Sequence, residues 1–142
     1  MKKLTVSVMV AATAALLSAC GGSQEQQALE IVGSYSDDWG TTHTITESSW
    51  TQHSEGMDDS VFEIAAYDND ADFLVAQGAA GNPFNPGKWS RFDWTESAGA
   101  LYFCQIVFDA ETQEAATANT GADRSDLEAG CNGFGWSKLN PQ

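Results

Sequence analysis

The stretch Trp89-Ser90-Arg91-Phe92-Asp93-Trp94 combines aromatic side chains with a guanidinium group, which is chemistry suited to recognition. Its alternation is typical of a strand, so Trp94 would form an apolar wall, and Arg91 would offer a charge to an acidic ligand group. Core packing explains the same pattern, with Arg91 pairing Asp93. The loop before this stretch presents Phe84 to solvent. The predicted ligand or partner contacts are Phe84, Trp89, Arg91 and Trp94.

The acidic run from 68 to 72 alternates carboxylate and amide side chains, as calcium loops do. However, Phe73 stands at the sixth position, where an EF-hand needs Gly, and Ala79 stands at the twelfth, where it needs Glu. A solvated turn is therefore the main interpretation, with a looser cation site as the alternative. His43 and His53 are the only histidines, and no set of zinc ligands surrounds them. We predict no metal site.

Nucleophilic catalysis needs a base beside the nucleophile, and the chain has no Gly-x-Ser-x-Gly elbow. Paired carboxylates for glycoside hydrolysis cannot be picked out of 20 acidic residues by sequence alone. The sequence therefore predicts a noncatalytic protein, with no catalytic residues and no cofactor.

The chain begins with the basic Met1-Lys2-Lys3, followed by an uncharged apolar run up to Ala19. This pattern is typical of an export signal, and the run is too short to span a bilayer. Its end, Leu17-Ser18-Ala19-Cys20, resembles the lipobox of bacterial lipoproteins. That resemblance implies cleavage after residue 19 and acylation of Cys20. An ordinary cleaved signal with a chance cysteine is the alternative.

Residues 20–29 begin with small and polar side chains and are predicted to form a flexible tether. Two or more acyl chains on Cys20 would hold the domain stably on a membrane. In Gram-negative lipoproteins, Asp after the cysteine retains the protein in the inner membrane, and here that position is Gly21. The resemblance therefore implies the outer membrane in a Gram-negative source, and otherwise the exterior of the cell membrane.

Cys104 and Cys131 remain after Cys20 is assigned, and an exported domain meets oxidising conditions. A disulfide between them is expected, and closing a loop of that length contributes about 3.5 kcal/mol. The alternative is a reactive or metal-binding thiol pair, but neither a Cys-x-x-Cys motif nor a flanking histidine accompanies these residues.

The charge of the chain is strongly negative. Six basic and 20 acidic residues give −14, and removal of the signal leaves four basic residues and a charge of −16. Such a surface repels nucleic acid, so nucleic-acid binding is excluded. The acidity either maintains solubility, attracts basic partners or attracts cations. Five Trp and seven Phe argue against disorder.

Alternating, β-branched segments separated by turn residues predict a β-rich single domain over 30–142. The predicted strands are 31–35, 42–50, 61–67, 72–77, 88–95, 101–108 and 134–139. Asp109 is predicted to cap a helix over 110–118. The spacing of Ser125 and Glu128 predicts a second short helix ending at Gly130.

Successive hairpins indicate a mainly β, antiparallel meander, which closes into a barrel because closure removes the sheet edges. The fragment Gly33-Ser34-Tyr35 resembles the Gly-x-Trp of lipocalins, with Tyr in place of Trp, and implies a small lipocalin-like barrel. The whole domain resembles uncharacterised small lipoproteins, from which no activity transfers.

The expected function is a lipid-anchored, noncatalytic binding domain for a small, apolar ligand. The alternative is a protein-binding lipoprotein, such as an inhibitor of a basic hydrolase, because periplasmic lysozyme inhibitors have a similar design and acidity suits a basic partner. An apolar cavity would favour the first hypothesis. A filled barrel with an exposed aromatic loop would favour the second, and a buried carboxylate or histidine in a cleft would favour an enzyme.

Overall fold

The computed structural model describes residues 27–142. The expected signal peptide, Cys20 and residues 20–26 of the expected tether lie outside the described residues. The elements in chain order are β1 (Gly33–Ser36), β2 (Thr42–Ile45), β3 (Ser49–His53), β4 (Ser60–Asp68), β5 (Phe73–Gly78), β6 (Trp89–Ser97), β7 (Ala100–Ala110), α1 (Gln113–Thr117) and β8 (Ser137–Pro141). Within 27–142, no helix is long and apolar enough to cross a bilayer.

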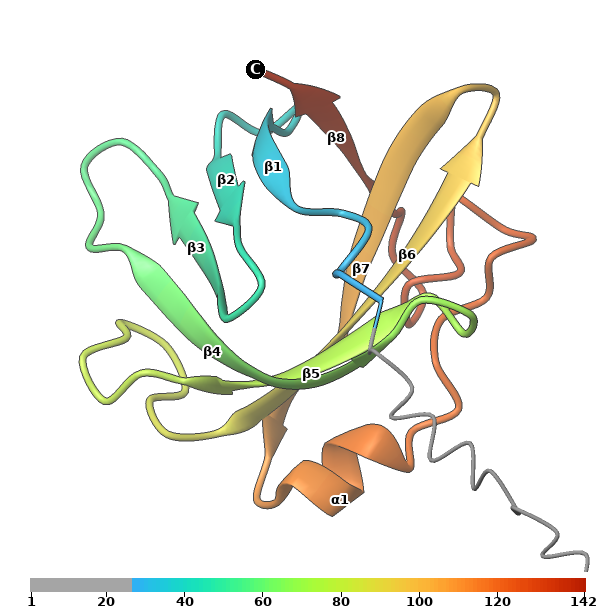
Figure 1. Ribbon diagram of the computed structural model, residues 1–142. Coiled ribbons are helices and arrows are strands. Elements are labelled where there is room, and N and C mark those ends of the chain that lie inside the picture. The colour runs from blue at the N-terminus through green and yellow to red at the C-terminus, as the bar shows by residue number, and fades with distance from the viewer. Residues whose placement is uncertain (1–26) are drawn as a thin grey trace, which may run out of the picture.

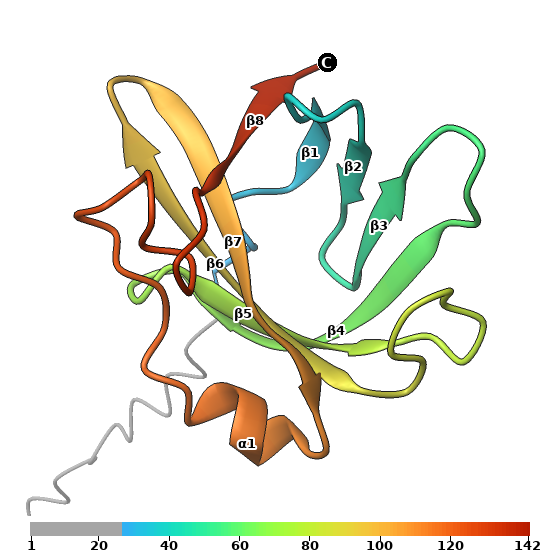
Figure 2. The same cartoon turned by 180° about the vertical axis from the view of Figure 1, so that it is seen from behind.

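The eight strands form a closed antiparallel barrel in which each strand pairs with its neighbour in sequence (Figures 1 and 2). The ring closes where β1 pairs with β8, with Tyr35 opposite Pro141 and Ser36 opposite Asn140. The predicted meander that closes into a barrel, with a short helix before the last strand, is therefore confirmed.

Aromatic side chains fill the inside of the barrel. The rings of Trp50 and Phe92 stack with centroids 4.5 Å apart, and Phe62 and Phe103 pack edge-on or tilted against this pair. All four side chains are buried, and aliphatic residues from the other strands complete the same cluster. The barrel interior is thus a packed core rather than a hollow.

The two ends of the barrel differ. At the first, which we call the hairpin end, strands are joined by the short turns 46–48, 69–72 and 98–99, and residues 27–32 run across it. At the second, the loop end, the longer loops 37–41, 54–59 and 79–88 join the strands.

Residues before β1 belong to the packed barrel. Leu29 is 2% exposed and joins the main core cluster together with Ile31. The backbone here is fixed by the turns, because the Leu29 N–H donates to Glu47 and the Asn69 amide donates to the carbonyl of Ala28. The sequence assigns Leu29 to the tether 20–29, but in the structure this residue is part of the barrel core.

The predicted strand 42–50 was wrong in its extent, because it contains a turn between β2 and β3. Thr46 makes this turn: its hydroxyl accepts the N–H groups of Ser48 and Ser49, and its own N–H donates to the carbonyl of Ser49. A side chain that satisfies the backbone in this way competes with the strand ladder. Consequently β3 extends into the segment 51–59 that was expected to be a loop.

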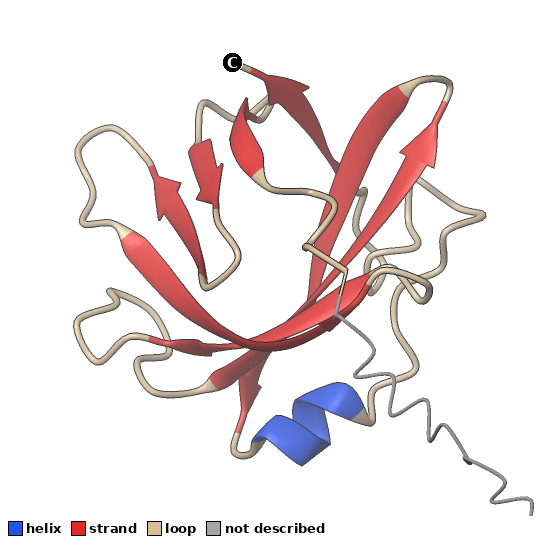
Figure 3. Cartoon of the chain, viewed as in Figure 1, coloured by secondary structure: helices blue, strands red, loops and turns tan. Residues whose placement is uncertain are grey.

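The helical predictions were partly wrong (Figure 3). The helix over 110–118 is the shorter α1, capped by the Thr112 hydroxyl rather than by Asp109, because β7 continues to Ala110 and pairs there with β6. The second helix does not form. Asp123 and Asp126 accept nearby backbone N–H groups in successive turns, so this segment has an alternative to helical hydrogen bonding.

The last strand begins at Ser137, three residues later than the predicted start of 134. Cys131 and Phe134 exchange two backbone hydrogen bonds in a tight turn, and Gly133 has a φ of +89° there. Positive φ values suit glycine, so this position turns the chain rather than extending it.

The connection 111–136 runs from α1 along the outside of β6 and β7, as Figure 2 shows in orange and red. The predicted disulfide between Cys104 and Cys131 is confirmed and ties this connection to β7.

A buried ion pair holds the same connection to β6. The Arg91 guanidinium donates to Asp93 at 2.7 Å and to the carbonyls of Thr117 and Asn119, while the second oxygen of Asp93 accepts the N–H of Ala122. Asp93 is fully buried, so the two hydrogen bonds that it accepts, from Arg91 and from Ala122, form away from water.

Candidate binding cavity at the hairpin end

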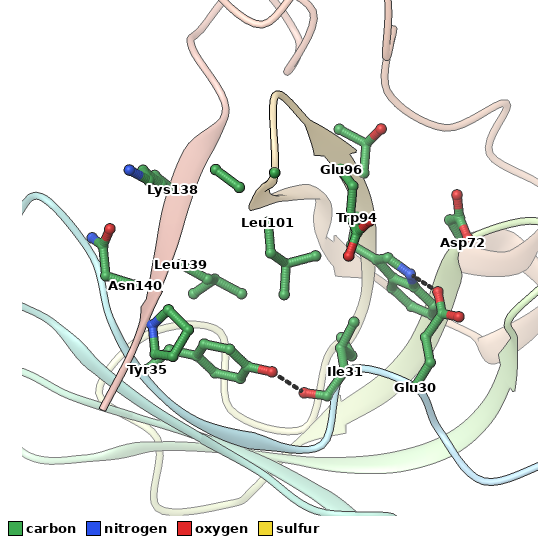
Figure 4. A pocket seen from close by; sticks show the side chains of 14 residues that line it. Glu30, Ile31, Tyr35, Asp72, Trp94, Glu96, Leu101, Lys138, Leu139 and Asn140 are labelled. Carbon is green, nitrogen blue, oxygen red and sulfur yellow. Dashed lines mark hydrogen bonds between the residues drawn. The ribbon is translucent and has the colours of Figure 1, made fainter.

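A cavity of about 780 Å³ lies at the hairpin end, between the segment before β1, the β4–β5 turn, the β6–β7 hairpin and β8 (Figure 4). This volume falls within the range of pockets that bind small molecules, roughly 300–1,000 Å³. Its lining comprises Glu30, Ile31, Tyr35, Asp72, Trp94, Thr95, Glu96, Gly99, Ala100, Leu101, Lys138, Leu139, Asn140 and Pro141.

Apolar side chains separate the cavity from the barrel core. Ile31 and Leu139 are buried in the main cluster, and Leu101 packs against it. Tyr35 crosses the same side, and its hydroxyl donates to the carbonyl of Ile31 at 3.1 Å. A Cβ at Gly33 would lie only about 3.0 Å from this hydroxyl, so the absence of a side chain there leaves room for the ring.

A second wall of the cavity carries carboxylates. Glu30 accepts a hydrogen bond from the indole N–H of Trp94 at 2.6 Å, and Figure 4 shows Asp72 on the same side. Partial burial raises the pKa of Asp72 above its usual value, and the Glu30 carboxylate raises it further, against the opposing effect of Arg124. The negative charge of Glu30 therefore opposes ionisation of the neighbouring Asp72 carboxyl group.

Positive charge is scarce around this cavity. Lys138 supplies the ammonium among the lining residues, and Figure 4 shows it across the cavity from Glu30 and Asp72. Arg124 is nearby, but its N–H groups donate to the backbone carbonyls of Trp94 and Asp72. With Glu96 as a third acid in the lining, the cavity has an excess of negative charge.

The four contact residues named from the sequence lie in different places. Trp94 lines the cavity, whereas Arg91 lies on the outer face of β6 in its ion pair with Asp93 and stacks over the ring of Phe73. Trp89 is half-buried at the other end of β6. Phe84 is exposed on the β5–β6 loop, at the loop end.

His43 is buried in the barrel, and both of its ring nitrogens are hydrogen-bonded. The Trp50 indole donates to Nδ1 at 3.1 Å, so Nε2 carries the hydrogen and donates to Asp37 at 3.0 Å. Burial lowers the pKa of His43 below its usual value, although Asp37 opposes this effect. The imidazole thus acts as a neutral hydrogen-bond bridge in the core. His53, by contrast, is exposed and pairs with Asp59.

The acidic run at 68–72 forms the β4–β5 turn. The Asp68 side chain accepts the N–H groups of Asp70 and Ala71, which is the ordinary role of Asp in a turn. Over residues 27–142, no group of three His, Cys, Asp or Glu side chains is close enough together to hold a metal ion.

The sequence did not single out Glu30 or the role of Asp72. Glu30 stands at the start of the predicted domain, and Asp72 was considered only as a possible cation ligand in its own turn. The flanking of Glu30 by the apolar Leu29 and Ile31 was the available signal, because such alternation is typical of a chain with one buried face.

Comparison with protein-family models, with curated proteins and with solved structures finds no match to this chain. Of the expected lipocalin-like architecture, the structure confirms an eight-stranded antiparallel barrel, and no family is identified. The fragment Gly33-Ser34-Tyr35 lies in β1, where Tyr35 lines the cavity and Gly33 leaves room for its ring.

Proposed function

We propose that this chain is an exported, lipid-anchored and noncatalytic binding domain whose hairpin-end cavity takes a small organic cation with an apolar portion. The observation that carries this proposal is the combination of an apolar floor with the paired carboxyl groups of Glu30 and Asp72 in one cavity of about 780 Å³. The ligand would remain in this recess, because the barrel core beneath it is filled by side chains.

A cation suits the carboxylate wall better than a neutral ligand does. The pKa of Asp72 is raised by burial and by the nearby Glu30 carboxylate, so Asp72 binds a proton more readily than a free aspartate. An ammonium group placed between the two would replace that proton and make charge-assisted hydrogen bonds, which are stronger than neutral ones. The affinity for a cation should therefore rise with pH through the range where Asp72 titrates.

The apolar portion of the ligand would lie against Ile31, Leu101 and Leu139. Trp94 is almost fully buried beside this floor, and its indole N–H holds the Glu30 carboxylate in place at the cavity wall. This refines the sequence-based expectation of an apolar ligand, because the lining combines apolar and acidic groups.

The noncatalytic part of the proposal rests on the lining and on His43. The described residues that line the cavity include no histidine, cysteine or serine. His43, which would be the natural general base, has both nitrogens engaged inside the barrel by Asp37 and Trp50.

A titration with three probes of equal chain length tests the cavity. We expect the full mature chain, carrying Cys20→Ser, to bind n-octylammonium more tightly than octanol and to bind octanoate least, as followed by the fluorescence of Trp94 and its neighbours. Replacing both Glu30→Gln and Asp72→Asn should weaken octylammonium binding by roughly tenfold, since charge-assisted hydrogen bonds are lost.

The matched control is Glu63→Gln with Asp70→Asn, which removes the same charge from exposed positions outside the cavity lining. If the control weakens binding equally, the attraction comes from the overall charge and not from the cavity. If octanoate binds as well as octylammonium, a cation site is refuted. Native mass spectrometry of the protein extracted from its own membranes would then identify the natural ligand.

The anchor is tested separately. In cells supplied with labelled fatty acid, the wild-type chain should incorporate label and stay with the membrane fraction, while Cys20→Ser should do neither. Fractionation of a Gram-negative source should place the labelled protein in the outer membrane. Label on the Cys20→Ser chain would refute lipidation at this residue without affecting the argument for the cavity.

A further inference from the structure

The loop end carries most of the large apolar side chains that the described residues expose. Trp39, Met57 and Phe84 project from its three loops, and Phe108 lies near the end of β7, where it lines a small cavity with Phe84. Single exposed apolar residues are ordinary, but several gathered at one end of a domain mark an interaction site. Aromatic residues and methionine are also the types enriched at protein interfaces.

These side chains belong to one surface. Phe84 and Phe108 together line a small cavity of about 220 Å³, whose wall also includes the buried Phe62. Gln52 and Ser60 line the same cavity, and they lie on either side of the loop 54–59 that carries Met57.

The loop that carries Trp39 adjoins this surface. The Thr41 hydroxyl is hydrogen-bonded to that of Ser54, so the loops 37–41 and 54–59 lie side by side. Figure 1 shows the loops β3–β4 and β5–β6 on one side of the barrel, and Figure 2 shows them together again from behind.

The loop bearing Phe84 is held rigidly although its tip is exposed. Asn82 is buried, and its side chain accepts the N–H of Val61 at 2.8 Å and donates to the carbonyl of Val61 at 2.9 Å. Gly87 donates back to Gly78, which closes the base of the loop. A preorganised loop loses little conformational entropy when its exposed ring is bound.

The charge around this surface is negative. The exposed carboxylates are Asp38, Glu55, Asp58, Asp59 and Asp109. The nearby basic side chains already have partners, since Lys88 pairs with Glu111 and His53 is hydrogen-bonded to Asp59. A partner that fits must therefore bring positive charge around an apolar contact.

We propose that the loop end is a docking surface for a basic protein, with Phe84 as its anchor. An apolar side chain of the partner would enter the small cavity between Phe84 and Phe108, and lysine or arginine residues around it would face Asp58, Asp59 and Asp109. This inference is independent of the cation cavity, because the small cavity beside Phe84 and the cation cavity share no lining residue.

Site-specific cross-linking in the source organism tests the surface on the intact lipoprotein. Benzoylphenylalanine replaces Phe84 in one strain and Phe134 in another. Phe134 is the matched control because it is also an exposed aromatic residue, at 75% against 63% for Phe84, and lies on the 111–136 connection outside the three loops. We expect irradiation to link one basic protein from position 84 and not from position 134.

The partner identified in this way is then purified and titrated against the mature chain. Phe84→Ala should weaken binding roughly tenfold or more, as expected of an interface anchor, while Phe134→Ala should leave it within about twofold. Added salt should weaken the wild-type complex, because its charges are at the rim. A neutral or acidic partner, a second copy of this chain, equal linking from both positions or no linked protein would each overturn the proposal.

Discussion

The two ends of this barrel use similar residue types in opposite ways. At the hairpin end, Leu29 and Ile31 are buried and the acidic Glu30 between them faces a cavity. At the loop end, Phe84 and Trp39 are exposed, and the acidic side chains surround them. Apolar burial stabilises the fold at the first end, whereas the second end leaves the same kind of area uncovered for another molecule to bury.

The comparison indicates that acidic residues have different roles at the two ends of the barrel. In the cavity, Asp72 and Glu30 are close enough for one to affect the protonation of the other. At the loop end, the carboxylates are exposed and spread around apolar side chains, where their effect is on the approach of charged partners. Variants that act on one end alone separate the two roles.

The largest effect is expected from Asp93→Ala, which removes the ion pair that holds the 111–136 connection to β6. Removing this carboxylate leaves the Arg91 guanidinium buried without its counter-charge, which costs about 3–5 kcal/mol of unfolding free energy. Urea denaturation measures this loss, and the exposed Asp109→Ala is the control, expected within about 0.5 kcal/mol. Adding Arg91→Met to Asp93→Ala should recover part of the stability, and no recovery would contradict the ion-pair explanation.

Replacing both Cys104→Ala and Cys131→Ala should reduce the unfolding free energy by about 3.5 kcal/mol, because the unfolded chain regains the freedom of the closed loop. Reduction of the wild-type protein should give the same loss in the same denaturation assay. The cation cavity at the hairpin end should keep its octylammonium affinity in the folded variant. A loss of that affinity would show that the outer connection also shapes the cavity.

Leu29→Ala tests whether the segment before β1 closes the hairpin end. This side chain is almost fully buried, so its truncation should cost about 3 kcal/mol in the same assay. Val32→Ala is the matched control on the same segment, and its exposed side chain predicts little change. Equal effects of the two substitutions would mean that residues 27–32 do not belong to the barrel core.

The smallest effect is a change in pH dependence at the cavity. The raised pKa of Asp72 means that the folded state holds its proton more tightly than the unfolded state, so ionisation of Asp72 lowers stability as pH rises above the usual aspartate value. Asp72→Asn should therefore be more stable than the wild type at pH 7, with the difference vanishing near pH 3. Asparagine also suits the φ of +54° found there.

Thermal unfolding at a series of pH values measures this difference. Asp70→Asn, in the same turn but exposed, should show no comparable trend. If Asp72→Asn is less stable than the wild type at pH 7, the interpretation that burial and Glu30 destabilise the ionised form of Asp72 is contradicted.

The fold could be predicted from sequence because its signals are local. The alternation of Phe92 and Trp94 with Arg91 and Asp93 assigned the two faces of β6, and antiparallel neighbours need only short turns. The helix signals near Ser125 failed because aspartate side chains offered the backbone other hydrogen bonds. Short polar segments leave such competition undecided.

The candidate site was harder to predict because its parts are distant in sequence. Glu30, Asp72 and Lys138 meet only through the register of strands that lie far apart along the chain. Trp94 was named from its own neighbourhood, but nothing local showed that its indole would donate to Glu30, 64 residues earlier.

The order of the strands also bears on the path by which the chain folds. Seven of the eight strand pairings join neighbours in sequence, whereas β1 and β8 are far apart, with a hydrogen bond between Ser36 and Asn140 that spans 104 residues. Ordering a long chain segment costs more entropy than closing a hairpin, and such distant pairings slow folding. We therefore expect hairpins to form early and the β1–β8 seam to set the folding rate.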